Sequence, residues 1–306
     1  MDLIEVRHEV REALSQRHPV VALESTVIAH GLPRPRNLET ARGMEAAVRE
    51  EGAVPATIGI MEGRAVVGLS DAELETLATA DHVVKASTAD IAPVVAAGKL
   101  GATTVAGTAY LAALAGIRVM ATGGIGGVHR GGDQSLDISA DLTELARSRV
   151  AVVSAGVKSV LDLARTLEVL ETLGVPVVGF GTNEFPAFYS RESGLSLTHR
   201  VDTPEAAARL LDAQWSLGLS SAIIFANPPP FDAAIDRSEM EAWIGQALET
   251  AGTNGITGKA VTPYLLGQLV ELSRGRTLET NVRVLESNAR LGGRVSVADA
   301  KVRSQE

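Results

Sequence analysis

The chain has 306 residues, of which 45% are apolar and only 3% aromatic, and its formal net charge is −9. This length can bury a large core, the small aliphatic residues suit helices packed on a sheet, and the acidic charge argues against a nucleic-acid partner. The absence of cysteine excludes disulfides, thiolate metal ligands and a cysteine nucleophile.

Short β-branched runs alternate with helical patterns along the chain, which predicts an α/β fold with a mainly parallel sheet. A short hairpin is expected over Gly63–Gly68, so some antiparallel pairing should occur. In chain order, the expected strands are Val20–Leu23, Ala56–Ile60, His82–Lys85, Thr103–Ala106, Arg118–Ala121, Val150–Ser154, Val175–Phe180 and Ser221–Phe225. The expected helices are Leu38–Glu50, Asp71–Ala80, Thr108–Ala115, Leu142–Ser148, Ser159–Leu173, Pro204–Leu217, Glu239–Thr250 and Pro263–Ser273.

No low-complexity linker, charge block or repeat divides the sequence, and we predict a single α/β catalytic domain over residues 1–306. The first twenty residues carry charges of both signs, which is not typical of a signal peptide. The longest apolar stretch, residues 105–121, is interrupted by Arg118 and does not predict a membrane span. We therefore expect a soluble, cytoplasmic protein with no membrane partner.

Two of the predicted strands end on a charged side chain, Glu24 after Val20–Leu23 and Lys85 in the third strand. A carboxylate at the end of a buried strand should have a raised pKa, which suits a proton donor near neutral pH. Pairing of Glu24 with a structural arginine is the alternative interpretation. Ligands of open α/β sheets bind at the carboxyl ends of the strands, so we expect these charges to converge on one cleft.

Lys158 follows the predicted strand Val150–Ser154, at the point where the helical pattern from Ser159 begins. Among apolar neighbours a lysine amine loses solvation, which favours its neutral, nucleophilic form. Such an amine is suited to imine formation with a sugar aldehyde. A lysine that caps or snorkels at a helix start is the alternative.

The segment 121–133 has six glycines in thirteen residues and follows a predicted strand directly. Glycine lets backbone N–H groups turn toward an anion such as a phosphate, although the spacing fits neither a P-loop nor a Rossmann fingerprint. His129 and Arg130 add a titratable group and a cation, which favours a ligand loop over a flexible surface loop.

Asp137, Ser139 and Asp141 come next, just before a predicted helix. Asp137 is a candidate metal ligand, Ser139 a hydrogen-bond donor, and Asp141 either a helix N-cap or an acid in the site. One carboxylate cannot enclose an ion, but Mg²⁺ or Mn²⁺ keeps most of its waters and takes few protein ligands.

These residues lie in long, unusual motifs through which the chain resembles the pseudouridine-5′-phosphate glycosidases, a family also described as indigoidine synthase A-like. The resemblance runs from about residue 4 to residue 300. Its motifs are ALESTVIAHGLPRPRN at 22–37, HVVKASTAD at 82–90, TTVAGT at 103–108, ATGGIGGVHRG at 121–131, SLDISADL at 135–142, VVSAGVKSVLDL at 152–163, VGFGTNEFPAFY at 178–189 and TLETNVRVLESNARLG at 277–292.

The resemblance implies a three-layer α/β/α sandwich with a mixed, mainly parallel central sheet, and a homotrimer. It implies that Glu24 is the proton donor, that Lys158 is the covalent nucleophile, and that Asp137 holds one divalent cation, with Mn²⁺ favoured over Mg²⁺. The substrate contacts that it implies are Lys85, Val105, His129, Ser139, Ala140, Asp141 and Asn281.

The implied activity is reversible cleavage of the carbon–carbon glycosidic bond of pseudouridine 5′-phosphate to uracil and ribose 5-phosphate, through a lysine–ribose imine. One alternative is a Schiff-base aldolase-type lyase acting on another sugar phosphate. Another is a non-catalytic nucleotide-binding protein. Only the first activity predicts free uracil as a product.

Overall fold

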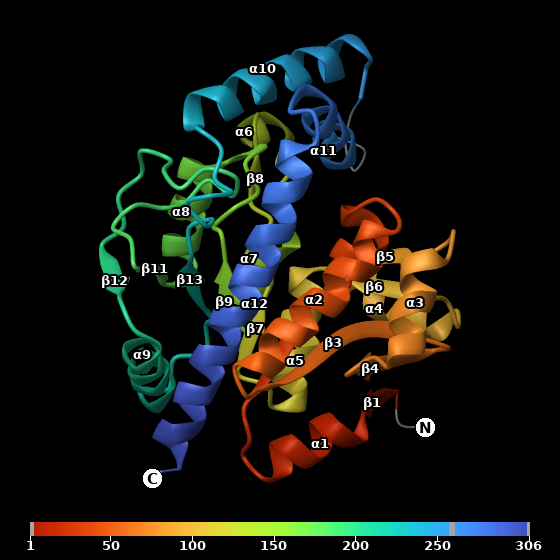
Figure 1. Cartoon of the computed structure of the whole chain (residues 1–306), viewed down its shortest axis with the longest axis vertical. Coiled ribbons are helices and arrows are strands. Elements are labelled where there is room, and N and C mark those ends of the chain that lie inside the picture. The colour runs from red at the N-terminus through yellow and green to blue at the C-terminus, as the bar shows by residue number, and fades with distance from the viewer. Residues whose placement is uncertain (1–2, 257–260, 305–306) are drawn as a thin grey trace.

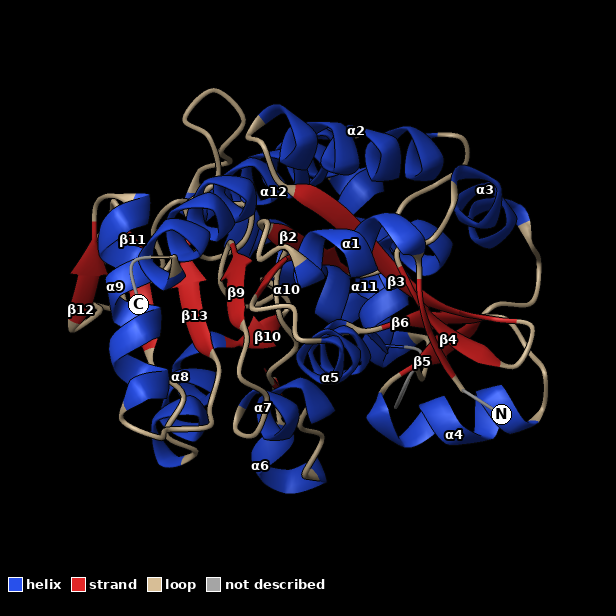
Figure 2. Ribbon diagram, turned by 90° about the horizontal axis from the view of Figure 1, so that it is seen from below, coloured by secondary structure: helices blue, strands red, loops and turns tan. Residues whose placement is uncertain are grey.

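The computed structural model describes residues 3–256 and 261–304, and its strands and helices form alternating layers (Figures 1 and 2). The strands are β1 Ile4–Val6, β2 Val20–Leu23, β3 Val54–Met61, β4 Arg64–Val67, β5 Val84–Ala86, β6 Gly101–Thr103, β7 Val119–Ala121, β8 Val128–His129, β9 Ala151–Ser154, β10 Leu161–Asp162, β11 Val177–Phe180, β12 His199–Val201 and β13 Ile223–Ala226. The helices are α1 His8–Ser15, α2 Arg36–Glu50, α3 Asp71–Thr79, α4 Thr88–Ala96, α5 Val105–Ala115, α6 Gly132–Ser135, α7 Ala140–Leu145, α8 Leu163–Thr172, α9 Pro204–Ser216, α10 Arg237–Thr253, α11 Val261–Leu272 and α12 Arg276–Arg303.

The central sheet has the order β1-β4-β3-β2-β7-β9-β13-β11-β12, and β6 pairs with β3 and β5 beside this path. Strands β3, β2, β7, β9, β13, β11 and β12 run parallel to one another. Strands β4 and β6 run antiparallel to β3. Strand β1 runs parallel to β4, and β5 runs parallel to β6. The expected hairpin after β3 is therefore confirmed, and the sheet is mixed but mainly parallel.

Two apolar cores lie on opposite faces of this sheet because successive strand residues point to opposite sides. Val21 and Leu23 of β2 belong to the core under α2, α9 and α12, whereas Val20 and Ala22 face α1, α5 and α7. Figure 2 shows α2 and α12 on one side of the strands and α5, α7 and α8 on the other. This arrangement confirms the three-layer α/β/α sandwich.

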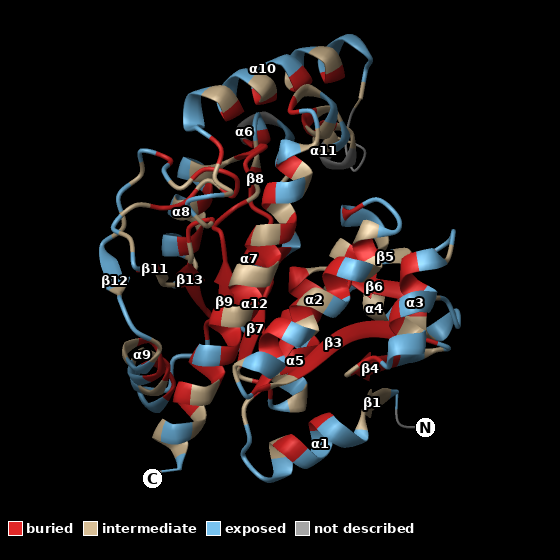
Figure 3. Cartoon of the chain, in the orientation of Figure 1, coloured by how far each residue is buried: buried red, intermediate tan, exposed pale blue. Residues whose placement is uncertain are grey.

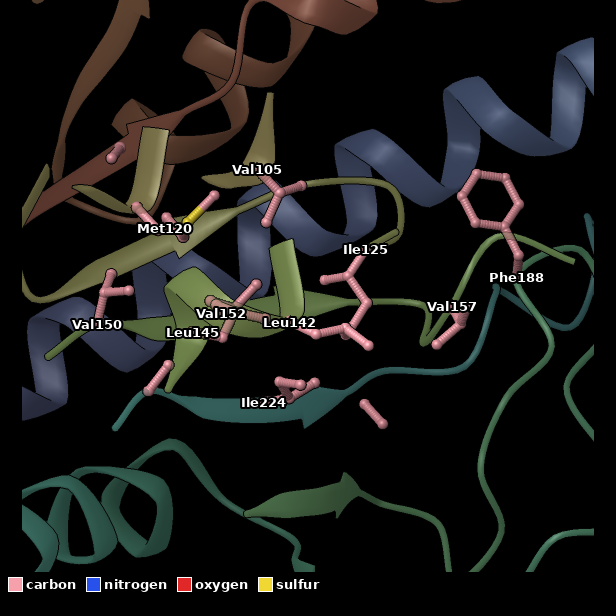
Figure 4. Packing of buried hydrophobic residues seen from close by; sticks show 14 of the residues in the cluster. Val105, Met120, Ile125, Leu142, Leu145, Val150, Val152, Val157, Phe188 and Ile224 are labelled. Carbon is pink, nitrogen blue, oxygen red and sulfur yellow. The ribbon is translucent and has the colours of Figure 1, made fainter. Parts of the chain in front are cut away.

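Side chains from neighbouring strands meet the helices closely in the interior. Figure 4 shows Met120, Val152 and Ile224, from β7, β9 and β13, beside Leu142 and Leu145 of α7. Buried residues follow the sheet and the inner helix faces, while exposed residues mark the outer faces of the helices (Figure 3). The sheet is thus covered on both sides, as expected for a mainly parallel sheet.

Each predicted strand and helix has a counterpart in the structure, with two shifts that matter for the site. The strand expected over Thr103–Ala106 is wrong in its bounds, because β6 ends at Thr103 and Val105 is the first residue of α5. Thr104 is the N-cap of α5, and its side chain accepts the Gly107 N–H. The helix expected from Ser159 begins only at Leu163, where Asp162 is the N-cap and accepts the Arg165 N–H.

The longest helix, α12, has no counterpart among the predicted helices. It crosses the sheet diagonally in Figure 1, between α2 and α9, and contacts β2, β7 and β9. Gly292 makes this close approach possible, because a Cβ there would lie 3.3 Å from the Ala121 and Val21 side chains. The other elements outside the sequence prediction are all short: β1, α1, the π-helix η1 at Val27–Gly31, α4, β8, α6, β10 and β12.

No helix in the described part of the chain is both long enough and apolar enough to cross a membrane.

Candidate active site

Two adjoining cavities open where β2, β7 and β9 end, and both are lined by Glu24, Thr26, Lys85 and Lys158. The first, here called the polar chamber, has a volume of about 310 Å³. Its other lining residues are Ser87, Asp90, Thr104, Val105, Gly126, Gly127, His129, Asp137, Ser139, Ala140, Asp141 and Leu161. The second, the aromatic chamber, has a volume of about 220 Å³. Its other lining residues are Val27, His30, Gly31, Gly123, Gly124, Ser159, Phe188, Tyr189, Leu266, Asn281 and Leu285.

All ten predicted site residues line these chambers. Glu24, Lys85 and Lys158 line both, and Asn281 lines the aromatic chamber. The other six line the polar chamber, namely Val105, His129, Asp137, Ser139, Ala140 and Asp141. The site therefore joins side chains from segments up to 257 positions apart in the sequence.

Glu24 follows β2 directly and is only 6% exposed. Burial raises the pKa of its carboxyl group, while the positive charge of Lys158 and a hydrogen bond from the Thr122 hydroxyl oppose that shift. The net direction is upward, as predicted for a proton donor. Its hydrogen-bond partner is a threonine, so pairing with a structural arginine was the wrong alternative.

Lys158 is half-buried four residues after β9 ends at Ser154. The turn needs Gly156, whose φ is +81° and where a Cβ would lie 2.4 Å from the Pro186 carbonyl oxygen. The Lys158 N–H then donates to the Ile125 carbonyl at 3.1 Å, which ties this turn to the glycine-rich segment. Because α8 begins only at Leu163, the alternative that Lys158 caps a helix is also wrong.

Lys85 reaches the site by a different route from the one expected. It lies inside β5 rather than at its end, and β5 runs opposite to β3 through β6. The carboxyl end of its strand therefore does not coincide with those of β2 and β9. Instead, β3 extends past the end of β2 and carries β6 and β5 beside the site, with Lys85 level with Ala102 and Ala102 level with Gly59.

Three helix N-termini also meet the polar chamber, those of α4, α5 and α7. Ser87 is the N-cap of α4, and Val105 is the first residue of α5. Unpaired backbone N–H groups and the helix dipole give such N-termini a partial positive charge. Carboxylates already accept one N–H at each of the α4 and α5 termini, Asp90 from Ser87 and Asp141 from Ala106. The remaining N–H groups, with Lys85 beside them, suit this wall of the chamber to an anion.

The glycine-rich segment is packed more tightly than an open phosphate loop. The Gly126 N–H donates to Asp141 Oδ2 at 2.8 Å, and a Cβ on Gly126 would lie 2.2 Å from Ser139 Oγ. Arg130 points away from both chambers: it bonds Glu241 and the Ser159 carbonyl and lines a separate cavity. The expectation that Arg130 supplies a cation to this site is therefore wrong.

Asp141 does not cap its own helix. Ser139 is the N-cap of α7 and accepts the Asp141 N–H, whereas the Asp141 carboxylate accepts N–H groups from Ala106 and Gly126 at 2.9 and 2.8 Å. Asp141 is thus a buried residue whose carboxylate links the start of α5 to the glycine-rich segment through these two hydrogen bonds.

Asp137 is half-exposed, and one of its carboxylate oxygens lies 3.7 Å from His129 Nδ1. The described residues contain no cluster of three or more His, Cys, Asp or Glu side chains that could hold a metal ion. A single carboxylate facing a polar cavity fits an ion that keeps most of its waters, as Mg²⁺ and Mn²⁺ do.

The structure adds residues that the sequence motifs did not single out. Thr122 positions Glu24, and its own carbonyl accepts from Asn288 of α12 at 2.7 Å. His30 lines the aromatic chamber, where partial burial and the positive charge of Lys85 hold its pKa below the usual value. The signal available for Thr122 and His30 was their place in two of the long motifs, and Thr122 also directly follows a predicted strand.

Glu24 follows β2 and Lys158 follows β9, two parallel strands on either side of β7. A buried carboxylate and a lysine in this arrangement define an α/β enzyme that binds its ligand at the carboxyl edge of the sheet. Residues 9–298 match the family described as "Indigoidine synthase A like protein", and the chain belongs to this family. It is 56% identical over 299 residues to the pseudouridine-5′-phosphate glycosidase of Deinococcus radiodurans, covering 98% of this chain and 96% of that one. The enzyme of the same name from Paracoccus denitrificans is 55% identical over 300 residues, with 97% and 99% covered.

Solved structures agree with this assignment. The prealnumycin C-glycosynthase AlnA, in complex with ribulose 5-phosphate, superposes with a TM-score of 0.94 and 43% identity over the whole of both chains. An indigoidine synthase A-like protein from Thermotoga maritima superposes with a TM-score of 0.87 and 42% identity over 96% of each chain.

Proposed function

We propose that this protein is a pseudouridine-5′-phosphate glycosidase, which cleaves pseudouridine 5′-phosphate with water to uracil and ribose 5-phosphate. One observation carries the proposal: Glu24 and Lys158 lie where a polar, anion-suited chamber meets an aromatic one. A phosphorylated sugar with a flat base on its C1′ matches that shape and polarity. The names of relatives at 55–56% identity support the same activity.

The bond to be broken explains why a carboxylate pair is not sufficient. Ordinary glycosidases protonate a leaving oxygen or nitrogen, but in pseudouridine ribose C1′ is joined to uracil C5, which has no lone pair. In the proposed reaction Glu24 transfers a proton to the ring oxygen as the furanose opens, and the Lys158 amine adds at C1′. The amine loses a proton as it adds, and Glu24, now a carboxylate, takes up this proton and returns it to uracil C5. The C1′–C5 bond then breaks with its electrons going to the uracil ring, while the nitrogen lone pair forms the C=N bond.

The sugar remains bound to Lys158 as an iminium ion, which water hydrolyses to ribose 5-phosphate and the free amine. The 5′-phosphate lies in the polar chamber, against Lys85 and the N-termini of α4 and α5. Asp137 would hold a hydrated Mn²⁺ or Mg²⁺ ion there, which would supply positive charge near the phosphate. The homotrimer and the cytoplasmic location expected from the resemblance are parts of the same proposal.

The direct test is incubation of the purified protein with pseudouridine 5′-phosphate and Mn²⁺, followed by chromatography for uracil and ribose 5-phosphate. Both products should appear in equal amounts. Turnover of another sugar phosphate without uracil release would instead favour the aldolase-type alternative.

Removal of the 5′-phosphate should lower kcat/KM by roughly 100-fold or more, because charge-assisted hydrogen bonds contribute roughly 1.5–3 kcal/mol each. Part of the loss should fall on kcat, since binding of the remote phosphate helps to hold C1′ against Lys158. The measurement compares pseudouridine with its 5′-phosphate, in the wild type and in Lys85→Ala. The preference should shrink in Lys85→Ala and stay unchanged in the control Arg130→Ala, whose side chain lies outside both chambers. Equal kcat/KM for nucleoside and nucleotide would refute the phosphate site.

Activity should depend on a divalent cation, and Asp137→Ala should remove most activity together with that dependence. The reason is that Asp137 lines the polar chamber and is half-exposed, so an ion bound to it could keep most of its waters beside the substrate phosphate. Rates are measured after chelation and during Mn²⁺ titration, with Asp71→Ala as a control, because Asp71 pairs with Arg42 on the surface. Full wild-type activity after exhaustive chelation would contradict the metal role.

A further inference from the structure

Phe188 and Tyr189 stand at the end of the motif over residues 178–189, which has no role in the chemistry described above. Both side chains are buried, with 5% and 3% of their surface exposed, and both line the aromatic chamber beside Lys158. Both residues belong to the loop between β11 and β12. This loop is separate from the segments after β2 and β9 that carry Glu24 and Lys158.

The backbone of this loop is held in an unusual conformation to place them. Phe188 has a φ of +63°, in the left-handed region that bulky residues rarely adopt. Its N–H donates to the Ala155 carbonyl at 3.0 Å, and its ring lies so close to Gly124 that a Cβ there would be 2.5 Å from Phe188 Cδ2. Figure 4 shows the ring beyond Ile125 and Val157. Strained residues of this kind concentrate at ligand sites.

Tyr189 packs edge-to-face on Phe188, with the ring centroids 4.6 Å apart and an interplanar angle of 75°. Burial alone raises the pKa of its phenol, so the hydroxyl stays neutral. No described residue forms a hydrogen bond with that hydroxyl. The hydroxyl oxygen also keeps some accessible surface, although the residue as a whole is buried. Buried tyrosine hydroxyls are usually hydrogen-bonded, so the missing partner is expected to arrive with the ligand.

We infer that Tyr189 is a specificity residue whose hydroxyl donates a hydrogen bond to a ring carbonyl of the nucleobase, while Phe188 forms an apolar wall beside the base. The inference rests on the proposed function and names the part of the site that recognises uracil. A neutral phenol is a donor matched to a pyrimidine carbonyl, and a base that lacks this acceptor would leave the hydroxyl buried and unpaired. Asn281 lines the same chamber and offers an amide as a second polar group.

The test is Tyr189→Phe, which removes only the hydroxyl and keeps the ring packing. In the synthetic direction, from uracil and ribose 5-phosphate, KM for uracil should rise about tenfold. Trapping of ribose 5-phosphate on Lys158 with borohydride should be unchanged, because the sugar end is untouched. The matched control is Tyr264→Phe, whose hydroxyl bonds the Asn254 side chain at 2.9 Å and does not line either chamber.

Thio-substituted bases supply a readout that loss of packing would not change. The wild type should discriminate against either 2-thiouracil or 4-thiouracil, because sulfur is the weaker acceptor, and Tyr189→Phe should lose that discrimination. An unchanged KM for uracil and unchanged selectivity among the three bases in Tyr189→Phe would overturn the inference while leaving the glycosidase activity in place. Failure of the wild type to release uracil at all would instead refute the proposed function.

Discussion

We expect Lys158→Ala to lower kcat for uracil release by roughly 10⁴-fold or more, the loss typical of removing a covalent nucleophile. The variant should still fold and bind ribose 5-phosphate, because Lys158 is half-buried and its backbone, not its side chain, holds the turn through Ile125. The measurement combines single-turnover kinetics with binding of ribose 5-phosphate by calorimetry.

Covalent trapping identifies the nucleophile independently of rate. Incubation with ribose 5-phosphate and borohydride, followed by peptide mapping, should place one reduced adduct on Lys158. Lys99→Ala, which changes an exposed lysine after α4, should give the same adduct as the wild type. An adduct mapped to Lys85, or appreciable turnover by Lys158→Ala, would reverse the assignment of roles in the site.

The layered fold follows from patterns that are visible in single segments. The run Val20–Leu23 is apolar at every position and Val150–Ser154 at every position but the last, as is typical of strands buried on both faces. Their odd and even residues separate into two cores, so the helices had to cover both sides of the sheet. Local patterns therefore predicted the α/β layers and the approximate bounds of the main strands, whereas the three-layer sandwich was expected from the family resemblance.

Helix α12 could not be recognised from local sequence in the same way. Its buried face includes polar residues such as Thr280 and Asn288, and Gly292 and Gly293 stand in its middle, where glycine is unfavourable for a helix. Asn288 donates to the Thr122 carbonyl and accepts from Asn227. Its burial is therefore compensated by hydrogen bonds to residues that are distant in the sequence. The apolar spacing of Val282, Leu285 and Ala289 was the signal that remained.

Which residues form the site could be predicted from the sequence more accurately than the reasons why they lie there. Lys85 was placed correctly, but strand direction was not deducible from the run 82–85, and β5 proved to oppose β2. The glycines of 121–133 were interpreted as phosphate donors, whereas Gly126 and Gly127 are needed because Ser139 and Thr166 approach too closely for a Cβ. Such contacts join distant segments, and no local pattern specifies them.

Glu24→Gln should lower kcat by roughly 10²–10⁴-fold, the usual contribution of a general acid, because glutamine fills the same space but transfers no proton. As a proton donor, Glu24 must be protonated, so wild-type kcat should fall as pH rises through its raised pKa. The residual kcat of Glu24→Gln should not show this fall with rising pH. The control Glu45→Gln changes a half-buried glutamate whose carboxyl pKa is also raised by burial. Glu45 accepts from Thr57 at 2.6 Å and lines neither chamber, so this variant should leave the kcat profile unchanged.

The same substitution should reveal the raised pKa as a difference in stability. The carboxyl of Glu24 has a higher pKa in the folded protein than in the unfolded chain, so the unfolded chain releases this proton first as pH rises. The wild type should therefore lose stability relative to Glu24→Gln from about the unfolded value, near pH 4.5, up to the folded pKa. Thermal unfolding of both proteins across this range measures the difference, which should widen with pH and then level off. A difference that is flat with pH, or that narrows, would mean that Thr122 and Lys158 outweigh burial and keep Glu24 ionised, in which case it could not act as the acid.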